Sequence, residues 1–216
     1  MRLAVVTMVL LGVQLSVARA APSDGIVNVT ASETTYRYAI HGTLPKYLFT
    51  LKWSHDRPVE IAIATERSPT RIQQHIPVPG TNLGAPGDHE RPSVLETADY
   101  NFDGYEDLRL ESSSGTGVTF WDIWLFDGAK KQFVHSPLLS NLPSPMPDAK
   151  QHWIETSSID GGGAYFSKSY FRWRNKSVHV VRIEDADRRQ DQGRRSDPAY
   201  RPRTPTRRGL HGRLRR

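Results

Sequence analysis

The chain has 216 residues and no cysteine. Disulfide bonds, a lipoprotein-type cysteine anchor and a cysteine nucleophile are therefore excluded. A small exported protein without disulfides needs another source of stability, and a bound metal ion is one such source.

The recognisable catalytic motifs are also missing. The eight histidines are scattered, with no His-Glu-x-x-His, and there is no Gly-x-Ser-x-Gly elbow, P-loop or dinucleotide fingerprint. The adjacent pairs His55-Asp56 and His89-Glu90 are interpreted as polar surface. We predict that the protein is not an enzyme. A secreted glycoside hydrolase stays open as an alternative, because two of the 21 acidic residues between 21 and 187 can meet across a cleft.

Long hydrophobic runs are absent except at the start of the chain. Met1-Arg2 precedes the apolar run 3–13, and Ala18-Arg19-Ala20 places small residues at the two positions that a signal peptidase reads. This pattern predicts a signal peptide over residues 1–20, cut before Ala21. We expect a periplasmic or secreted protein with no stable membrane anchor.

The net charge of +6 is unevenly distributed along the chain. Residues 21–187 hold 16 Lys and Arg against 21 Asp and Glu, whereas residues 188–216 hold 11 Arg and two Asp. The predicted domain, 21–187, is therefore acidic, and the basic character lies in an Arg- and Pro-rich tail, 188–216. This tail has too few apolar residues to fold, so we predict that it is disordered; contact with an anionic surface is the alternative. It lacks interleaved aromatic residues for base stacking, and no nucleic-acid partner is expected.

Between the signal peptide and the tail, no segment keeps a helical period over ten residues. Short stretches rich in β-branched and aromatic residues alternate with turn signals, which predicts strands. The expected strands cover 36–40, 47–53, 59–64, 107–111, 119–126, 132–134, 152–156, 165–173 and 178–183. The fold class is all-β and antiparallel, with one irregular β-propeller-like domain.

The most informative stretch is the nine-residue loop Asp99–Asp107. Oxygen-bearing side chains stand at positions 1, 3, 5 and 9, and Gly104 at position 6 permits a backbone turn with positive φ. This spacing suits Ca²⁺, which takes six to eight oxygen ligands. The predicted ligands are Asp99, Asn101, Asp103, the carbonyl of Tyr105, and Asp107. A solvated Asx-rich turn is the alternative, and a bound ion would be structural rather than catalytic.

Two glycine-rich segments are candidate contact loops. Ser112–Gly117 lies between the loop's following strand and the aromatic run 120–124, and Asp160–Tyr165 is a second glycine-rich tip. A firm, narrow loop can enter a cleft with little loss of entropy. An ordinary hairpin turn is the alternative for each. The predicted partner-contact residues are Ser114, Gly115, Thr116, Gly117 and Tyr165.

Several of these segments together resemble one family. They are Asp-Tyr-Asn-Phe-Asp-Gly-Tyr-Glu-Asp-Leu (99–108), Ser-Gly-Thr-Gly (114–117), Phe-Trp-Asp-Ile-Trp-Leu-Phe-Asp (120–127), Lys131-Gln132-Phe133, and the segment from Leu138-Leu139 to Pro147-Asp148. Over residues 93–184 the chain resembles the calcium-binding, propeller-like periplasmic immunity proteins that inhibit lysozyme-like type IV secretion effectors. The loop has the spacing of integrin-type calcium loops.

The resemblance implies that the loop residues are calcium ligands, and it identifies no residue that enters a lysozyme cleft. The predicted function is therefore a calcium-stabilised periplasmic inhibitor of a lysozyme-like peptidoglycan hydrolase. The alternative is a calcium-stabilised glycan- or protein-binding module without inhibitory activity.

Overall fold

The computed structural model describes residues 24–78, 94–115, 117–160, 165–174 and 177–187. The predicted signal peptide, 1–20, and the Arg- and Pro-rich tail, 188–216, lie outside these residues. Among the described residues, no helix is long and apolar enough to cross a membrane.

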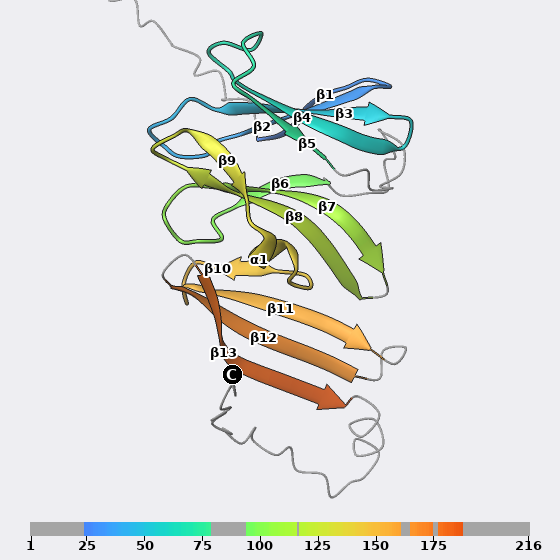
Figure 1. Ribbon diagram of the computed structural model, residues 1–216, viewed down its shortest axis with the longest axis vertical. Helices are drawn as coiled ribbons and strands as arrows, with labels where there is room; N and C mark the ends of the chain where they lie inside the picture. Colours follow the sequence, from blue (N-terminus) through green and yellow to red (C-terminus); the bar gives the residue numbers. More distant parts are fainter. Residues whose placement is uncertain (1–23, 79–93, 116, 161–164, 175–176, 188–216) are drawn as a thin grey trace, which may run out of the picture.

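The described residues form three antiparallel sheets, each a simple meander of consecutive strands (Figure 1). The first sheet has the order β1-β2-β3-β4-β5, with β1 (Gly25–Val29), β2 (Glu33–Tyr38), β3 (Tyr47–Ser54), β4 (Arg57–Thr65) and β5 (Gln74–Pro77). The second contains β6 (Leu95–Ala98), β7 (Asp107–Gly115), β8 (Val118–Asp127) and β9 (Gln132–His135). The third contains β10 (Met146–Asp148), β11 (Trp153–Asp160), β12 (Tyr165–Arg174) and β13 (Ser177–Asp187). One turn of helix, α1 (Pro137–Ser140), connects the second sheet to the third.

The first sheet packs on the second through side chains that alternate along their strands. In β3, Tyr47, Phe49, Leu51 and Trp53 are buried while the residues between them are partly exposed. The Tyr47 ring meets the Phe126 ring edge-on at 5.8 Å between centroids. The Phe49 ring meets Phe133 at 5.5 Å. This period of two is what a strand with one buried face requires.

The second sheet lies between the other two, so its longest strand is apolar on both faces (Figure 1). Trp124 and Phe126 of β8 belong to the core shared with the first sheet. Ile123 of the same strand belongs to a second core cluster with Tyr100, Leu139 and Ile154, which joins the third sheet. The apolar run of β8 therefore follows from its place in a middle layer.

The all-β antiparallel class is confirmed, whereas the described strands close into neither a barrel nor a ring of propeller blades. The four strands without a predicted counterpart, β1, β5, β6 and β10, are only three to five residues long. A pattern with period two has too few repeats to be recognised over such lengths.

The predicted glycine-rich loop 112–117 is shorter in the structure than expected. Residues 112–115 continue β7, and Val118 already begins β8. The Ser-rich sequence is compatible with a strand here because this end of β7 is exposed.

Candidate metal centre and contact loops

The loop between β6 and β7 folds around its own amide groups. The N–H of Asp103 donates to Oδ1 of Asp99 at 3.2 Å and to Oδ1 of Asn101 at 3.1 Å. The N–H of Gly104 donates to Oδ2 of Asp99 at 2.9 Å, and that of Tyr105 donates to Oδ1 of Asp103 at 2.9 Å. Asn101 Nδ2 also donates to Asp103 Oδ2 at 2.9 Å. The structure therefore brings three of the predicted ligand side chains together.

Two residues turn the backbone of this loop with positive φ. Gly104 has φ of +87°, as predicted from its position. Phe102 has φ of +59°. The sequence did not indicate this, because residues other than glycine adopt a positive φ only rarely. The Phe102 ring stacks on His152 at 5.3 Å with an interplanar angle of 6°, and this contact with the third sheet accompanies the unusual backbone.

Asp107, the last predicted ligand, is fully buried. Its Oδ2 accepts the N–H of Tyr100 at 2.8 Å, and its Oδ1 accepts the N–H of Phe126 in β8 at 2.8 Å. Burial raises the pKa of Asp107 to about 8, although the two amide hydrogen bonds favour the ionised form; the negative charges of Asp103 and Asp99 raise it further. A cation close to this carboxyl would favour the carboxylate instead.

The donor atoms of the loop fit a hard cation such as Ca²⁺, because all of them are oxygens. In the described part of the chain, no three His, Asp or Glu side chains gather as a metal site, so a cation at the loop would also need the Asn101 amide oxygen and a backbone carbonyl. Each Asp107 oxygen keeps a lone pair beside its amide hydrogen bond. The assignment of Asp99, Asn101, Asp103, Tyr105 and Asp107 as calcium ligands stays a prediction.

The loop touches all three sheets. Toward the first sheet, the N–H of Glu106 donates to the carbonyl of Ile40 at 2.8 Å, and the Tyr105 ring lies 4.6 Å from His41. Toward the third sheet, the hydroxyl of Tyr100 donates to the carbonyl of Pro145 at 3.2 Å. Anything that orders this loop therefore also orders the contacts between the sheets.

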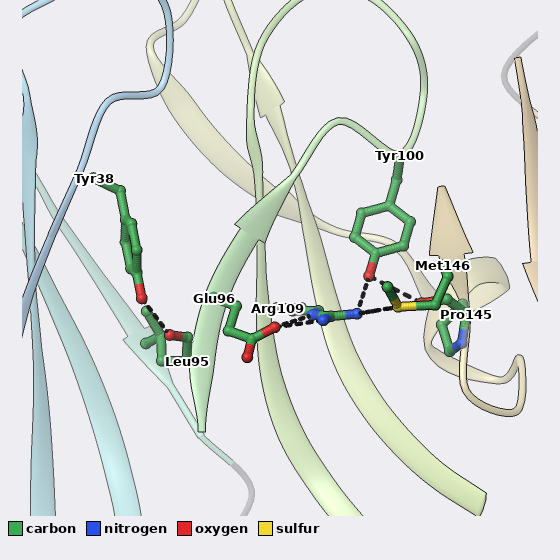
Figure 2. A network of polar contacts seen from close by, with 7 residues as sticks. All are labelled: Tyr38, Leu95, Glu96, Tyr100, Arg109, Pro145 and Met146. Carbon is green, nitrogen blue, oxygen red and sulfur yellow. Dashed lines mark hydrogen bonds and ion pairs between the residues drawn. The ribbon is translucent and has the colours of Figure 1, made fainter. Parts of the chain in front are cut away.

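Figure 2 shows a polar network beside the loop, centred on Arg109 of β7, which is itself buried. The guanidinium pairs with Glu96 of β6, donates to the Tyr100 hydroxyl at 2.9 Å, and lies over the Trp121 ring at 4.1 Å from its centroid. It also donates to the carbonyl of Pro145 at 3.3 Å. Sequence reasoning missed this network, because nothing in the spacing of Glu96, Tyr100 and Arg109 marks them as partners.

Burial raises the pKa of Tyr100 to about 12, so its phenol stays protonated at neutral pH. A protonated phenol can accept a hydrogen bond from Arg109 and donate one to Pro145 at the same time. The same residue donates its backbone N–H to Asp107. Tyr100 therefore joins the candidate metal loop to the buried network.

The described residues of the two predicted contact segments lie near each other, at the ends of β7 and β11. Gly117 directly precedes β8. A Cβ added to it would lie 2.8 Å from Cβ of Ile159 in β11. Ile159 is one residue from Asp160, which pairs with Tyr165 at the end of the β11–β12 hairpin. Ser114 and Gly115 are exposed at the end of β7, whereas Thr116 and residues 161–164 lie outside the described residues.

Gly117→Ala is expected to lower the free energy of unfolding by about 1–3 kcal/mol. Gly117 has φ of +77°, where a side chain is strained, and the new methyl group would collide with Ile159. Gly115→Ala is the matched control, since a Cβ there meets nothing within 4 Å and its change should stay within about 0.5 kcal/mol. Urea denaturation of both variants measures the difference. Equal losses would show that the two hairpin ends are not packed as described.

Ser140, His135 and Asp122 lie near one another and have the residue types of a nucleophile, base and acid. His135 Nε2 lies 3.2 Å from Ser140 Oγ and 3.8 Å from Asp122 Oδ1, so both contacts use the same ring nitrogen. A Ser-His-Asp relay needs one ring nitrogen for each partner. The Ser140 hydroxyl also donates to the carbonyl of Ser136 at 3.0 Å and accepts the N–H of Ile123 at 3.0 Å. Through these hydrogen bonds, Ser140 connects the helix α1 to the strand β8.

The fold defines an all-β protein of three stacked antiparallel meanders. A solved structure described as a Xanthomonas type IV secretion system related protein is similar to it, with a TM-score of 0.54 and 14% sequence identity, over 80% of this chain and 90% of that one. The likeness at this identity concerns the fold. No protein-family model matches the chain. No curated protein matches it either.

Proposed function

We propose that the protein is a calcium-stabilised periplasmic inhibitor of a lysozyme-like peptidoglycan hydrolase, and that it acts by binding rather than by catalysis. The observation that carries the proposal is the fold shared with the type IV secretion system related protein of Xanthomonas. The resemblance of residues 93–184 to immunity proteins of such systems supports the same function.

The packing of the hairpin ends also supports a blocking role. Gly117 beside β8 packs against Ile159 near the end of β11, so a partner that binds there would meet strand ends that already contact each other. Binding to a preorganised surface loses little conformational entropy. We propose that Ser114, Gly115, Thr116, Gly117 and Tyr165 contact the hydrolase.

The charge distribution favours a cationic partner. Residues 21–187 carry five more acidic than basic side chains. A negative surface speeds the approach of a positive enzyme and makes the association rate sensitive to salt.

The function is tested with the purified chain and lysozyme-type glycosidases of several families, by following the lysis of cell walls. We expect at least one family to be inhibited in the presence of Ca²⁺, with weaker inhibition after chelation by EDTA. A variant that replaces Ser114 and Gly115 with bulky residues, here Trp, should fold normally and inhibit less. Binding to purified peptidoglycan without inhibition of any enzyme would support the alternative, a non-inhibitory binding module.

Calcium binding is tested separately by thermal unfolding. Asp99, Asn101, Asp103, the Tyr105 carbonyl and Asp107 would hold the ion, which would cross-link the loop. At a free Ca²⁺ concentration one hundred times the dissociation constant, the folded state gains about 2.7 kcal/mol.

Asp103→Ala is therefore expected to abolish the rise in Tm that Ca²⁺ produces in the chelated protein. Asp148→Ala is the matched control, because Asp148 also closes a local turn through the N–H groups of Lys150 and Gln151 but is not one of the predicted calcium ligands. It should keep the full response to Ca²⁺. A Tm that does not change when millimolar Ca²⁺ is added to the chelated wild type would refute the calcium site.

A further inference from the structure

The last strand of the third sheet, β13, has an outer edge with exposed apolar side chains. In the described part of the chain β13 pairs with β12 alone, and it ends the sheet order. Val180 is 54% exposed, and Val181 and Ile183 are each 46% exposed. Long edge strands of this kind are templates for pairing with another strand.

The apolar side chains of β13 continue a buried face of the sheet. The register sets Val178 opposite Trp173 and Val180 opposite Phe171. Val178, Trp173 and Phe171 pack against the core cluster between the second and third sheets. Val180 follows on the same face by the alternation of a strand, but it reaches solvent.

The residues around Ile183 form a regular stretch beyond a bulge. Arg182, Ile183 and Glu184 pair in sequence with Tyr170, Ser169 and Lys168, whereas Val181 has no partner in β12. Arg182 and Glu184 lie on one face of the strand, where they form an ion pair with each other. On that face Tyr170 donates its hydroxyl to Glu184 at 3.0 Å.

Symmetry restricts how two such edges can pair. Consider two copies of one strand that pair antiparallel about a two-fold axis perpendicular to the sheet. Directly opposed residues point to the same face, and side chains alternate between the two faces along each strand. The axis must therefore lie midway between one residue and the same residue of the other copy. An axis at Arg182 would oppose two arginines, and an axis at Glu184 would oppose two glutamates. An axis at Ile183 places Ile183 opposite Ile183 of the other copy. It also places Arg182 of each copy opposite Glu184 of the other copy, which gives two pairs of opposite charge. Opposite charges across a pair of strands stabilise it, and like charges destabilise it.

We propose that β13 pairs antiparallel with β13 of a second copy of this chain, with the two-fold axis at Ile183. The pairing joins two four-stranded sheets into one of eight strands. The charge pattern of residues 182–184 selects this register over its neighbours. The edge strand β1 of the first sheet, in contrast, has the uncharged sequence Gly-Ile-Val-Asn-Val and sets no such register.

Sedimentation velocity of the full chain across the micromolar range tests the proposal. The wild type should show a dimer fraction that grows with concentration. Arg182→Glu and Glu184→Arg should each raise the dissociation constant of the homodimer by about tenfold or more, since both opposite-charge pairs become like-charge pairs. An equimolar mixture of the two variants should recover the dimer, because every opposed pair is again of opposite charge.

The double variant Arg182→Glu/Glu184→Arg is the matched control, because it exchanges the charges but keeps the ion pair within the strand. It should form dimers like the wild type. A wild type that stays monomeric at every concentration would overturn the proposal. That is the result expected if residues 188–216, rather than a second copy, covered the edge. Charge reversals without effect, or a mixture that fails to recover the dimer, would also overturn it.

Discussion

Asp107→Ala is expected to lower the free energy of unfolding by about 2–6 kcal/mol. The carboxyl group of Asp107 accepts two backbone N–H groups, from Tyr100 in the loop and from Phe126 in β8. The substitution leaves both donors buried without a partner, and each such donor costs about 1–3 kcal/mol. Chemical denaturation in the presence of EDTA measures this effect without any contribution from a bound ion.

Asp127→Ala is the matched control for this prediction. Asp127 also accepts two backbone N–H groups, those of Ala129 and Lys130, each at 3.0 Å, but it does so at an exposed turn. Water can replace the lost acceptor there, so the expected loss is about 1 kcal/mol or less. If the two variants lose the same stability, the buried Asp107 side chain does not hold the loop on β8.

Arg109→Met is expected to lower the free energy of unfolding by about 2–4 kcal/mol. Methionine keeps much of the side-chain volume but leaves the carboxylate of Glu96 and the hydroxyl of Tyr100 without their buried cationic partner (Figure 2). Breaking a fully buried ion pair from one side costs about 3–5 kcal/mol. Arg109 is 10% exposed but Glu96 is 31% exposed, so water compensates part of the carboxylate charge that the substitution leaves unpaired. The contact with the Trp121 ring is lost as well, and fluorescence of the tryptophans should report the change.

The comparison for Arg109 is an exposed ion pair of the first sheet. Lys52 and Glu60 lie 2.8 Å apart, with both side chains accessible to solvent. Lys52→Ala should cost about 1 kcal/mol or less. Combining Arg109→Met with Glu96→Gln should restore part of the stability, because the second change removes the uncompensated charge. Additive losses in the double variant would show that the two residues do not act as a pair.

These two predictions concern one structural unit. The loop 99–107 contacts the first sheet through Tyr105, the second through Asp107 and the third through Phe102. A change that loosens the loop should therefore also loosen the packing between sheets. Under the proposed function, calcium would act on the contact surface through this packing, at a distance from the hairpin ends.

The positions of the long strands and of the loop were predictable from local patterns. Alternation of buried and partly exposed residues marks β3, and aromatic and β-branched residues mark β8 and β12. The turn at Gly104 follows from the one residue type that takes a positive φ without strain. Such features depend on residues that are only a few positions apart, so they can be recognised in a single sequence.

The partners of the buried polar groups were not predictable. Asp107 was expected to face a cation, and the structure shows both of its oxygens bound to backbone amides, one of them 19 residues away in β8. Arg109 and Pro145 are 36 residues apart and give no sign in the sequence that they meet. Their pairing depends on how the second sheet packs against the third.

The sequence by itself determined an all-β chain without disulfides, its long strands, and an oxygen-rich loop with a glycine at its turn, because period, residue size and backbone freedom act locally. Tertiary structure alone decided that three meanders stack, that the loop contacts each of them, and that two hairpin ends meet at Gly117 and Ile159. The physical reason is that burial between layers selects the partners of each side chain, and those partners come from distant parts of the chain.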